Sequence, residues 1–127
     1  MIVGMGIDIA ELTRLENSVK RFQNAFLNRI FTPAELAEGA RRKSAAAYYA
    51  GRWAVKEAVA KALGTGIGKS CSWQDIETLN RPDGRPETRL SGAARQRFGE
   101  LGADRLLTTI SHEEHHAVAM AILEKLP

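Results

Sequence analysis

Residues 44–64 read SAAAYYAGRWAVKEAVAKALG, and this segment carries the strongest secondary-structure signal in the chain. Alanine and other good helix formers dominate it, it contains no proline, and Gly51 is its single weak point. Gly64 follows as a C-terminal stop. We therefore expect the longest helix of the protein between Ser44 and Leu63.

The sequence before this helix predicts a strand and two shorter helices. Residues Ile2–Ile9 alternate with the period of a strand. Apolar residues recur at helical spacing in Glu11–Phe22, which predicts an amphipathic helix. Thr32–Glu35 combines a capping threonine, a proline at the first helical position and a glutamate three residues after the cap. A second short helix should begin there and end near Gly39.

The sequence after the long helix predicts a hairpin and another helix. Trp73–Leu79 and Glu87–Leu90 have the character of strands, and the turn sequence Arg81–Gly84 joins them. Ser91 is expected to cap a helix that reaches about Leu101.

The C-terminal residues predict at least one further strand. Leu106–Ile110 is expected to be that strand, whereas Glu113–Leu126 combines strong helix formers with an alternating apolar pattern. Local propensity leaves this last segment open between helix and strand. The whole pattern indicates one α+β domain, residues 1–127, with a mainly antiparallel sheet packed against the long central helix.

Length and composition are those of an ordinary globular protein. The chain has 127 residues, of which 44% are hydrophobic and 26% charged, enough for one core. A net charge of +3 and a pI near 9.3 favour anionic partners.

Cys71 is the only cysteine, which excludes an intrachain disulfide and a closed zinc–thiolate site. A location in the reducing cytoplasm is therefore predicted. With no basic leader and no apolar stretch near the ~20 residues of a membrane span, a soluble cytoplasmic protein is expected.

Asp8 is unusual for a residue inside a strand. Gly4 and Gly6 share its face, so that face is cleared of side chains and something can approach the carboxylate closely. The alternative interpretation is an aspartate at a strand end that bonds its own backbone or caps the next helix.

Trp53, Glu57 and Lys61 follow one another at helical spacing, so they share one face of the long helix. The simple interpretation is a surface ion pair between Glu57 and Lys61. Asp8 and Glu57 together would instead suit magnesium, which prefers oxygen ligands and often shares substrate phosphates.

A phosphate substrate bound near this magnesium ion would also need positive charge from the protein. Lys56, Lys61 and the loop Gly64–Lys69 would supply it, and the glycine-rich backbone of the loop could approach the anion closely. The loop is not a Walker A motif, because Leu63 occupies the position of the required first glycine and the loop follows a helix. An ATPase is therefore excluded.

His112–His116 matches the H-E-x-x-H signature of zinc proteases, in which a helix places two histidines on one face. The motif lies close to the C-terminus, follows a β-like run and has no evident third ligand. The competing interpretation of His115 and His116 is a solvated, inert cluster at a turn.

Three segments together resemble the holo-[acyl-carrier-protein] synthase group of phosphopantetheinyl transferases. They are Gly6-Ile7-Asp8-Ile9 with Arg14, the stretch Arg52–Gly66, and Ile110-Ser111-His112, in the order and spacing of that group. The likeness extends over nearly the whole chain. It implies transfer of 4'-phosphopantetheine from coenzyme A to a serine of an apo acyl carrier protein, in support of fatty acid biosynthesis. It also implies the small α+β fold of the group and a homotrimer with active sites between subunits.

The resemblance assigns roles residue by residue. Asp8 and Glu57 would bind Mg²⁺ together with the pyrophosphate of coenzyme A, and Lys61 would neutralise charge that develops during the transfer. Arg14 matches the position that docks the carrier protein, and Arg21 would extend the same basic surface toward an acidic partner. Coenzyme A binding is implied for Lys61, Gly64, Thr65, Gly66, Ser111 and His112. No nucleic acid and no membrane insertion are implied.

Two departures and one rival interpretation accompany this resemblance. His115-His116 stands where the turn of the group is variable. Trp53-Ala54-Val55 stands where members of the group often have phenylalanine followed by two small residues, so Trp53 is expected to reshape the pocket wall. The rival is a binding module for an acidic protein, which would use the same basic surface without needing Asp8 and Glu57 to meet.

Overall fold

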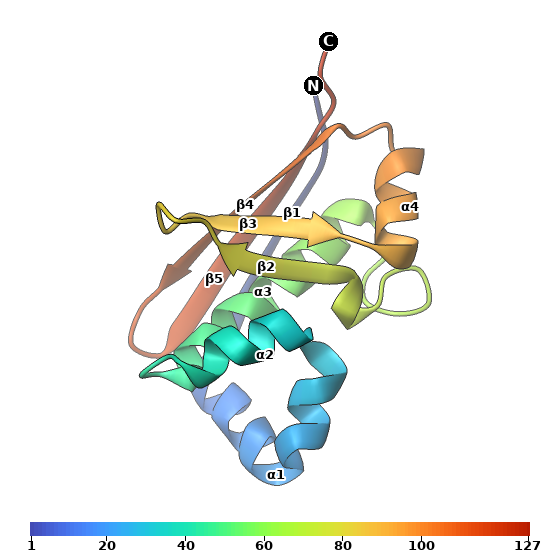
Figure 1. Ribbon diagram of the computed structural model, residues 1–127. Helices are drawn as coiled ribbons and strands as arrows, with labels where there is room; N and C mark the ends of the chain where they lie inside the picture. Colours follow the sequence, from blue (N-terminus) through green and yellow to red (C-terminus); the bar gives the residue numbers. More distant parts are fainter.

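The computed structural model describes all residues from 1 to 127. In chain order the elements are β1 (Ile2–Glu11), α1 (Leu12–Ile30), α2 (Pro33–Ala40), α3 (Ala45–Leu63), the 3-10 turn η1 (Trp73–Asp75), β2 (Ile76–Asn80), β3 (Pro86–Leu90), α4 (Gly92–Glu100), β4 (Arg105–His112) and β5 (His116–Glu124). One antiparallel sheet has the order β1-β5-β4, and β2 and β3 form a separate antiparallel hairpin (Figure 1). The predicted α+β class is therefore confirmed.

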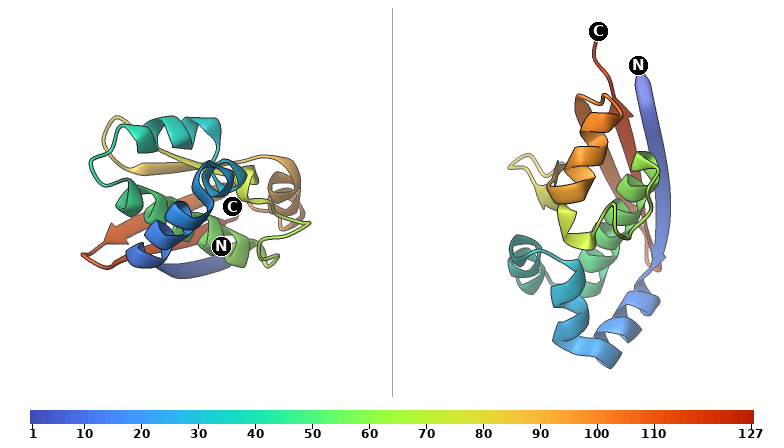
Figure 2. Two further views of the ribbon diagram at one scale, coloured as in Figure 1. Left: turned by 90° about the horizontal axis from the view of Figure 1, so that it is seen from below. Right: turned by 90° about the vertical axis from the view of Figure 1, so that its right-hand side faces the viewer.

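The three-stranded sheet is covered on one face only. The helices and the hairpin all lie on the same side of it, with α3 directly against the strands (Figure 2). The two termini lie side by side, and the Met1 amino group donates a hydrogen bond to the carbonyl oxygen of Lys125 at 2.8 Å. This arrangement leaves the outer face of the sheet without a covering element.

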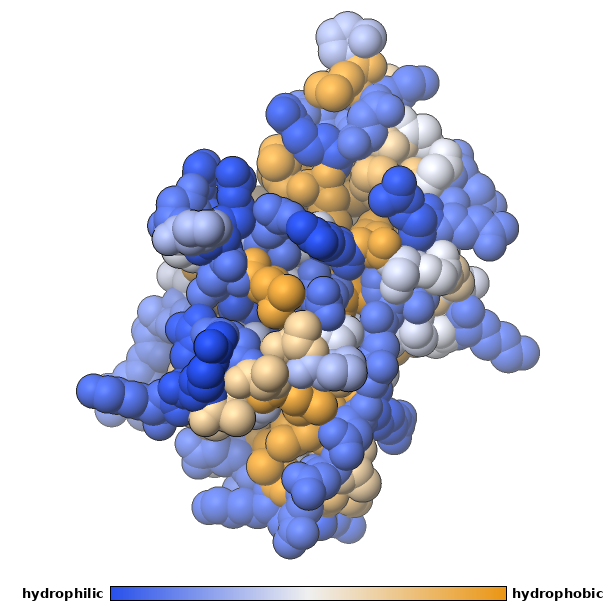
Figure 3. All heavy atoms as spheres, viewed as in Figure 1, coloured by the Kyte–Doolittle hydropathy of each residue, from blue (hydrophilic) through white to orange (hydrophobic).

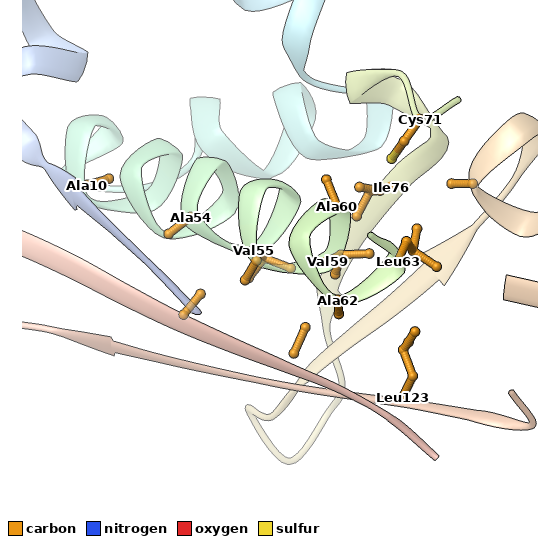
Figure 4. Packing of buried hydrophobic residues seen from close by; sticks show 14 of the residues in the cluster. Ala10, Ala54, Val55, Val59, Ala60, Ala62, Leu63, Cys71, Ile76 and Leu123 are labelled. Atoms are coloured by element: carbon orange, nitrogen blue, oxygen red, sulfur yellow. The ribbon is translucent and has the colours of Figure 1, made fainter. Parts of the chain in front are cut away.

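Helix α3 forms at the predicted position and provides the core. The Ser44 hydroxyl accepts the N–H of Ala47 at 3.3 Å, and Gly64 ends the helix in the left-handed region with φ of 77°. Val55, Val59 and Leu63 are fully buried. Side chains of α3 fill the space between the strands on one side and the segment from Cys71 to Ile76 on the other (Figure 4).

On the inner face of the sheet, β1 and β5 carry mostly small side chains, which lets α3 approach these two strands closely. The buried β5 residues on this face are Ala117, Ala119, Ala121 and Leu123. On β1, a Cβ atom added to Gly6 would lie 1.9 Å from the carbonyl oxygen of Ala58, and one on Gly4 would lie 2.3 Å from that of Ala62. The face of β1 that glycine clears of side chains is therefore filled by the backbone of α3.

The outer face of the sheet is apolar and exposed. Met5, Ile7 and Ile9 are 58%, 55% and 62% exposed. Their partners across β5 are Ile122, Met120 and Val118, which continue the apolar surface because paired residues share a face of the sheet. By contrast, the face that carries the helices and the hairpin is covered mainly by hydrophilic side chains (Figure 3).

Two predicted elements have different limits in the structure. The amphipathic helix expected to end at Phe22 continues to Ile30 after a break at Gln23, whose φ is 51°. The strand expected from Trp73 begins only at Ile76 because Trp73–Asp75 form η1.

The start of α4 differs from expectation in its capping, and the structure settles the C-terminal segment. Ser91 occupies the N-cap position of α4, as predicted, but its side chain makes no capping bond; the Asp75 carboxylate accepts the N–H of Ala94 at 3.2 Å instead. The segment left open between helix and strand is β5, paired with both β1 and β4.

None of the helices is long and apolar enough to cross a membrane.

Candidate functional site

Strand β1 and helix α3 bring three of the predicted residues together. The Lys61 ammonium donates hydrogen bonds to Oδ1 of Asp8 at 3.1 Å and to the carbonyl oxygen of Ile7 at 3.0 Å. Glu57 lies one helical turn before Lys61. It is near enough to Asp8 that, besides burial, the negative charge of Asp8 raises the pKa of Glu57. This convergence depends on Gly4 and Gly6, which allow the close contact of β1 with α3.

The two simpler interpretations of these residues are wrong. Asp8 does not cap the following helix, because Glu11 occupies the N-cap position of α1. Lys61 forms its ion pair with Asp8, across elements, instead of with Glu57 on its own helix.

The electrostatics of the site are those of two carboxylates competing for one cation. Burial raises the pKa of Glu57, the negative charge of Asp8 raises it further, and the Lys61 ammonium opposes both effects. The side chain of Asp8 is only 16% exposed, which limits screening by solvent. A further cation beside these carboxylates would relieve their repulsion.

Asp8, Glu57 and Lys61 line one pocket of about 530 Å³. Arg14 of α1 and His116 of β5 contribute charged or polar groups to its wall. Trp53 lines it as well, with its ring 4.5 Å from that of Trp73 and nearly parallel to that of Phe26 at 6.0 Å. Trp53 therefore lies on the pocket wall, as expected, and His116 is a lining residue that sequence analysis treated as inert.

The donor set fits magnesium. Nowhere in the chain do three or more His, Cys, Asp or Glu side chains gather closely enough to hold a metal ion. Asp8 and Glu57 would thus provide two carboxylates and leave the other positions to water and phosphate oxygens, the mixed shell that Mg²⁺ prefers.

Other predicted coenzyme residues lie elsewhere in the chain. Gly64 and Thr65 line a separate hollow with Lys69 and Arg97, and Gly66 follows in the same loop. None of these residues lines the pocket of Asp8 and Glu57.

Ser111 and His112 lie at the end of β4, away from the pocket. Nε2 of His112 donates to the carbonyl oxygen of Ala47 at 3.1 Å, and its ring occupies the space that Gly51 leaves beside α3. Glu57 is about 9 Å further along the helix axis than Gly51. A single chain therefore does not unite His112 with the carboxylates.

Arg14 connects the pocket with a second hollow on α1 that is also lined by Arg21. The Arg21 guanidinium lies 5.1 Å from the ring centroid of Phe22, which is itself exposed. The two arginines predicted to form a basic surface thus border the same hollow.

The zinc-protease interpretation is wrong. His112 ends β4 and His116 begins β5, so the motif spans a turn between strands instead of a helix. Nδ1 of His116 bonds Oε1 of Glu113 at 2.7 Å while His112 bonds the backbone of α3. The two histidines do not converge on a shared site.

Lys56 does not supply a cation to the pocket, contrary to the prediction. Its side chain is fully buried and its ammonium lies 2.8 Å from Oε1 of Glu35, which is also fully buried. Sequence analysis missed this partner, because Glu35 was assigned only to the capping box that it forms with Thr32.

Comparison with known families decides what this architecture represents. A family model described as the 4'-phosphopantetheinyl transferase superfamily matches residues 4–121. The chain belongs to this superfamily. Among its relatives, the holo-[acyl-carrier-protein] synthase of Geotalea daltonii is 42% identical, in an alignment that covers 98% of this chain and the whole of that protein.

Solved structures of the superfamily agree with the fold over nearly its full length. Holo-[acyl-carrier-protein] synthase from Neisseria meningitidis matches with a TM-score of 0.91 and 38% identity, covering 98% of this chain and all of that one. The Bacillus anthracis enzyme, solved in complex with CoA (3',5'-ADP), matches with a TM-score of 0.83 and 38% identity over 99% of each chain.

Proposed function

We propose that this protein is a magnesium-dependent holo-[acyl-carrier-protein] synthase. It transfers 4'-phosphopantetheine from coenzyme A to a serine of apo acyl carrier protein and releases adenosine 3',5'-bisphosphate. The observation that carries the proposal is the meeting of Asp8, Glu57 and Lys61 in one pocket. Relatives named for this activity, one of them solved with CoA (3',5'-ADP), support it.

The chemistry requires positioning and charge neutralisation more than a nucleophile of the enzyme. Asp8 and Glu57 would hold Mg²⁺, which when bound would draw charge from the pyrophosphate. The oxygen of the carrier serine forms a bond to the β-phosphorus as the bond from that phosphorus to the bridging oxygen breaks, and the serine proton is released. Lys61, which lines the pocket beside Asp8 and Glu57, stabilises the negative charge on the departing 3',5'-ADP.

The basic surface of α1 is the proposed docking site for the carrier protein. Arg14 lines both the pocket and the hollow that it shares with Arg21, so a carrier bound there would present its serine beside Asp8. Acidic carrier proteins would complement both guanidinium groups and associate faster at low salt. A cytoplasmic location and a part in fatty acid biosynthesis remain predictions from the resemblance.

A homotrimer with active sites between subunits is the proposed assembly. The outer face of the sheet exposes Met5, Ile7 and Ile9 together, an apolar surface of the kind that subunits cover. Within one chain, Ser111 and His112 cannot reach the pocket of Asp8 and Glu57. A neighbouring copy would bring its β4 end over the pocket and complete the coenzyme site.

The assembly can be tested by mixing two inactive variants. Asp8→Ala removes a metal ligand and His112→Ala removes the proposed contact from the neighbouring copy. If each site is built from two subunits, refolding the two variants together restores part of the activity, because some interfaces then combine two intact halves. Ile7→Glu should separate the subunits in light scattering and abolish turnover. Activity of a monomeric Ile7→Glu protein would contradict the shared site.

The activity itself is tested by chromatography of adenosine 3',5'-bisphosphate released from coenzyme A. The release should require both apo acyl carrier protein and Mg²⁺, and EDTA should stop it. A binding module for an acidic protein would bind the carrier without releasing the nucleotide, which would contradict the proposal.

A further inference from the structure

Lys56 precedes Glu57 on α3 but points away from the pocket into the core. Its side chain and that of Glu35 are both 0% exposed. A buried ammonium is costly unless each of its three N–H donors meets an acceptor. The surroundings of Lys56 show whether that condition is met.

All three donors of Lys56 have partners. The ammonium bonds Oε1 of Glu35 at 2.8 Å, the carbonyl oxygen of Trp73 at 3.0 Å, and the carbonyl oxygen of Ile76. Burial lowers the pKa of Lys56, and the charge of Glu35 opposes that effect. The site is thus a complete acceptor cage for a charged ammonium.

Glu35 is held just as fully. Its Oε1 also accepts the N–H of Thr32 at 2.9 Å, and its Oε2 accepts the N–H of Thr78 at 2.9 Å. The carboxylate therefore joins the start of α2 to β2, and Lys56 joins both to α3. An apolar pair of similar volume often stabilises a fold equally well, so stability alone does not account for these charges.

The two backbone acceptors of Lys56 lie at the ends of η1. Trp73 begins this turn and Ile76 follows it as the first residue of β2. Residues 64–72, which include the predicted coenzyme residues Gly64, Thr65 and Gly66, lead from α3 into η1. Lys56 consequently ties α3 to the point where this loop returns to the fold.

Lys56 also bears on the rotation of α3 about its axis, because it is the residue next to Glu57. Successive residues on a helix point about 100° apart, so a side chain anchored at one position sets the direction of the next. Lys56 in its cage therefore contributes, with the other buried residues of α3, to the orientation in which Glu57 faces Asp8.

We propose that Lys56, held by Glu35, is a positioning residue for the transfer reaction that aims Glu57 at Asp8 and anchors the loop carrying Gly64, Thr65 and Gly66. The inference rests on the proposed function and adds a residue that touches neither metal nor substrate. Misplacing reacting groups by about 1 Å can cost about 10²-fold in rate, which gives such an anchor a measurable effect.

Arg52 provides a matched control, because it is a buried cation on α3 one turn before Lys56. Its Nε donates to the carbonyl oxygen of Thr78 at 3.2 Å and its Nη2 to Oδ1 of Asn80 at 2.8 Å. Arg52 therefore ties α3 to β2 without holding η1 or Glu35. Lys56→Met and Arg52→Met both remove a buried anchor, but only the first releases the turn that follows the loop.

The test compares wild type, Lys56→Met, Glu35→Gln and Arg52→Met well below the melting temperature of each folded variant. Titration calorimetry measures the affinity for adenosine 3',5'-bisphosphate in Mg²⁺, and steady-state assays give kcat and KM for coenzyme A. Lys56→Met should lose about 10-fold or more in both affinity and kcat, and Glu35→Gln should lose less in the same direction. Arg52→Met should lower the melting temperature but leave affinity and kcat within about threefold.

A folded Lys56→Met protein with wild-type affinity and kcat would overturn the inference, as would an equal loss in Arg52→Met. If Lys56→Met does not fold, the nearly isosteric Glu35→Gln decides, and unchanged affinity and kcat in it refute the positioning role. An inactive wild-type protein would instead mean that the proposed function is wrong.

Discussion

Replacing Gly6 with alanine should damage the site without touching any ionisable group. The added Cβ would lie 1.9 Å from the carbonyl oxygen of Ala58 and 2.9 Å from the N atom of Ala62. Real Cβ atoms essentially never approach another heavy atom within 3.0 Å, so β1 and α3 must separate by about 1 Å. Both obstructing atoms belong to the backbone, so no side-chain rotation can relieve the contact.

The expected cost follows from this separation. Forcing an extra methyl group into a packed interior typically costs 1–3 kcal/mol, and a backbone obstruction places Gly6→Ala near the upper end, at about 3 kcal/mol. For a domain of this size that corresponds to a fall in melting temperature of roughly 10 °C. Because the movement also carries Asp8 away from Lys61 and Glu57, kcat should fall by about 10²-fold.

Gly99→Ala is the matched control for Gly6→Ala. Gly99 lies in α4, has no neighbour within 4 Å of an added Cβ and is not in the left-handed region. Alanine there should raise stability by about 0.5–1 kcal/mol and leave turnover unchanged. Calorimetry and a turnover assay at 25 °C measure both effects. A Gly6→Ala protein with normal melting temperature and normal kcat would refute the close contact of β1 with α3.

Three further predictions concern the charges of the pocket. Lys61→Met should lower kcat by about 10²-fold, because it removes the cation that stabilises the leaving group. It should change the free energy of unfolding by less than about 1 kcal/mol, because the side chain of Lys61 is 52% exposed. A large loss of stability in denaturant titrations would contradict this. Glu57→Gln should abolish turnover yet hold or raise the melting temperature of the metal-free protein at pH 7. The raised pKa of Glu57 means that the folded state binds the proton of this carboxyl more tightly than the unfolded state does. The contribution of Glu57 to stability is therefore present at low pH and is lost as pH rises through the folded pKa. A clear loss of stability in Glu57→Gln would show that the carboxylate is favourably placed without metal. At limiting Mg²⁺ the acidic limb of turnover should therefore lie above the ordinary pKa of glutamate, and it should move to lower pH as Mg²⁺ is increased because the metal competes with the proton. A limb insensitive to Mg²⁺ would exclude Glu57 as the titrating ligand.

The long helix and the first strand could be predicted because their local signals are unambiguous. Helix formers fill residues 45–63 without interruption by proline, and Gly64 ends the helix in the expected left-handed conformation. The clearing of one face of β1 by Gly4 and Gly6 correctly indicated that something packs close to Asp8. These features depend on residues near one another in the chain.

Features that depend on distant partners could not be predicted in the same way. Alanine, methionine and leucine in residues 116–124 suit a helix, but pairing with both β1 and β4 makes this segment a strand. Lys56 and Glu57 are adjacent, and only the positions of α2 and η1 determine that one faces the core and the other the pocket. The lysine looked like a phosphate ligand because its buried carboxylate partner lies on another helix.

The outer face of the sheet shows a third limit of sequence reasoning. Alternation in β1 separates Met5, Ile7 and Ile9 from the glycines, which would ordinarily place these large side chains in the core. The structure places the glycine face inward and the large side chains outward. Large apolar side chains on the outer face are what the proposed assembly requires, because a neighbouring subunit would cover them.

The most direct test of the proposed activity is the intact mass of an apo acyl carrier protein after incubation with this protein, coenzyme A and Mg²⁺. Wild type should add the mass of one phosphopantetheine group to the carrier, and Asp8→Ala, which removes the carboxylate bonded by Lys61, should add none. No mass gain on several competent carriers, or an equal gain with Asp8→Ala, would contradict the assignment of the pocket on β1 and α3 as the catalytic site.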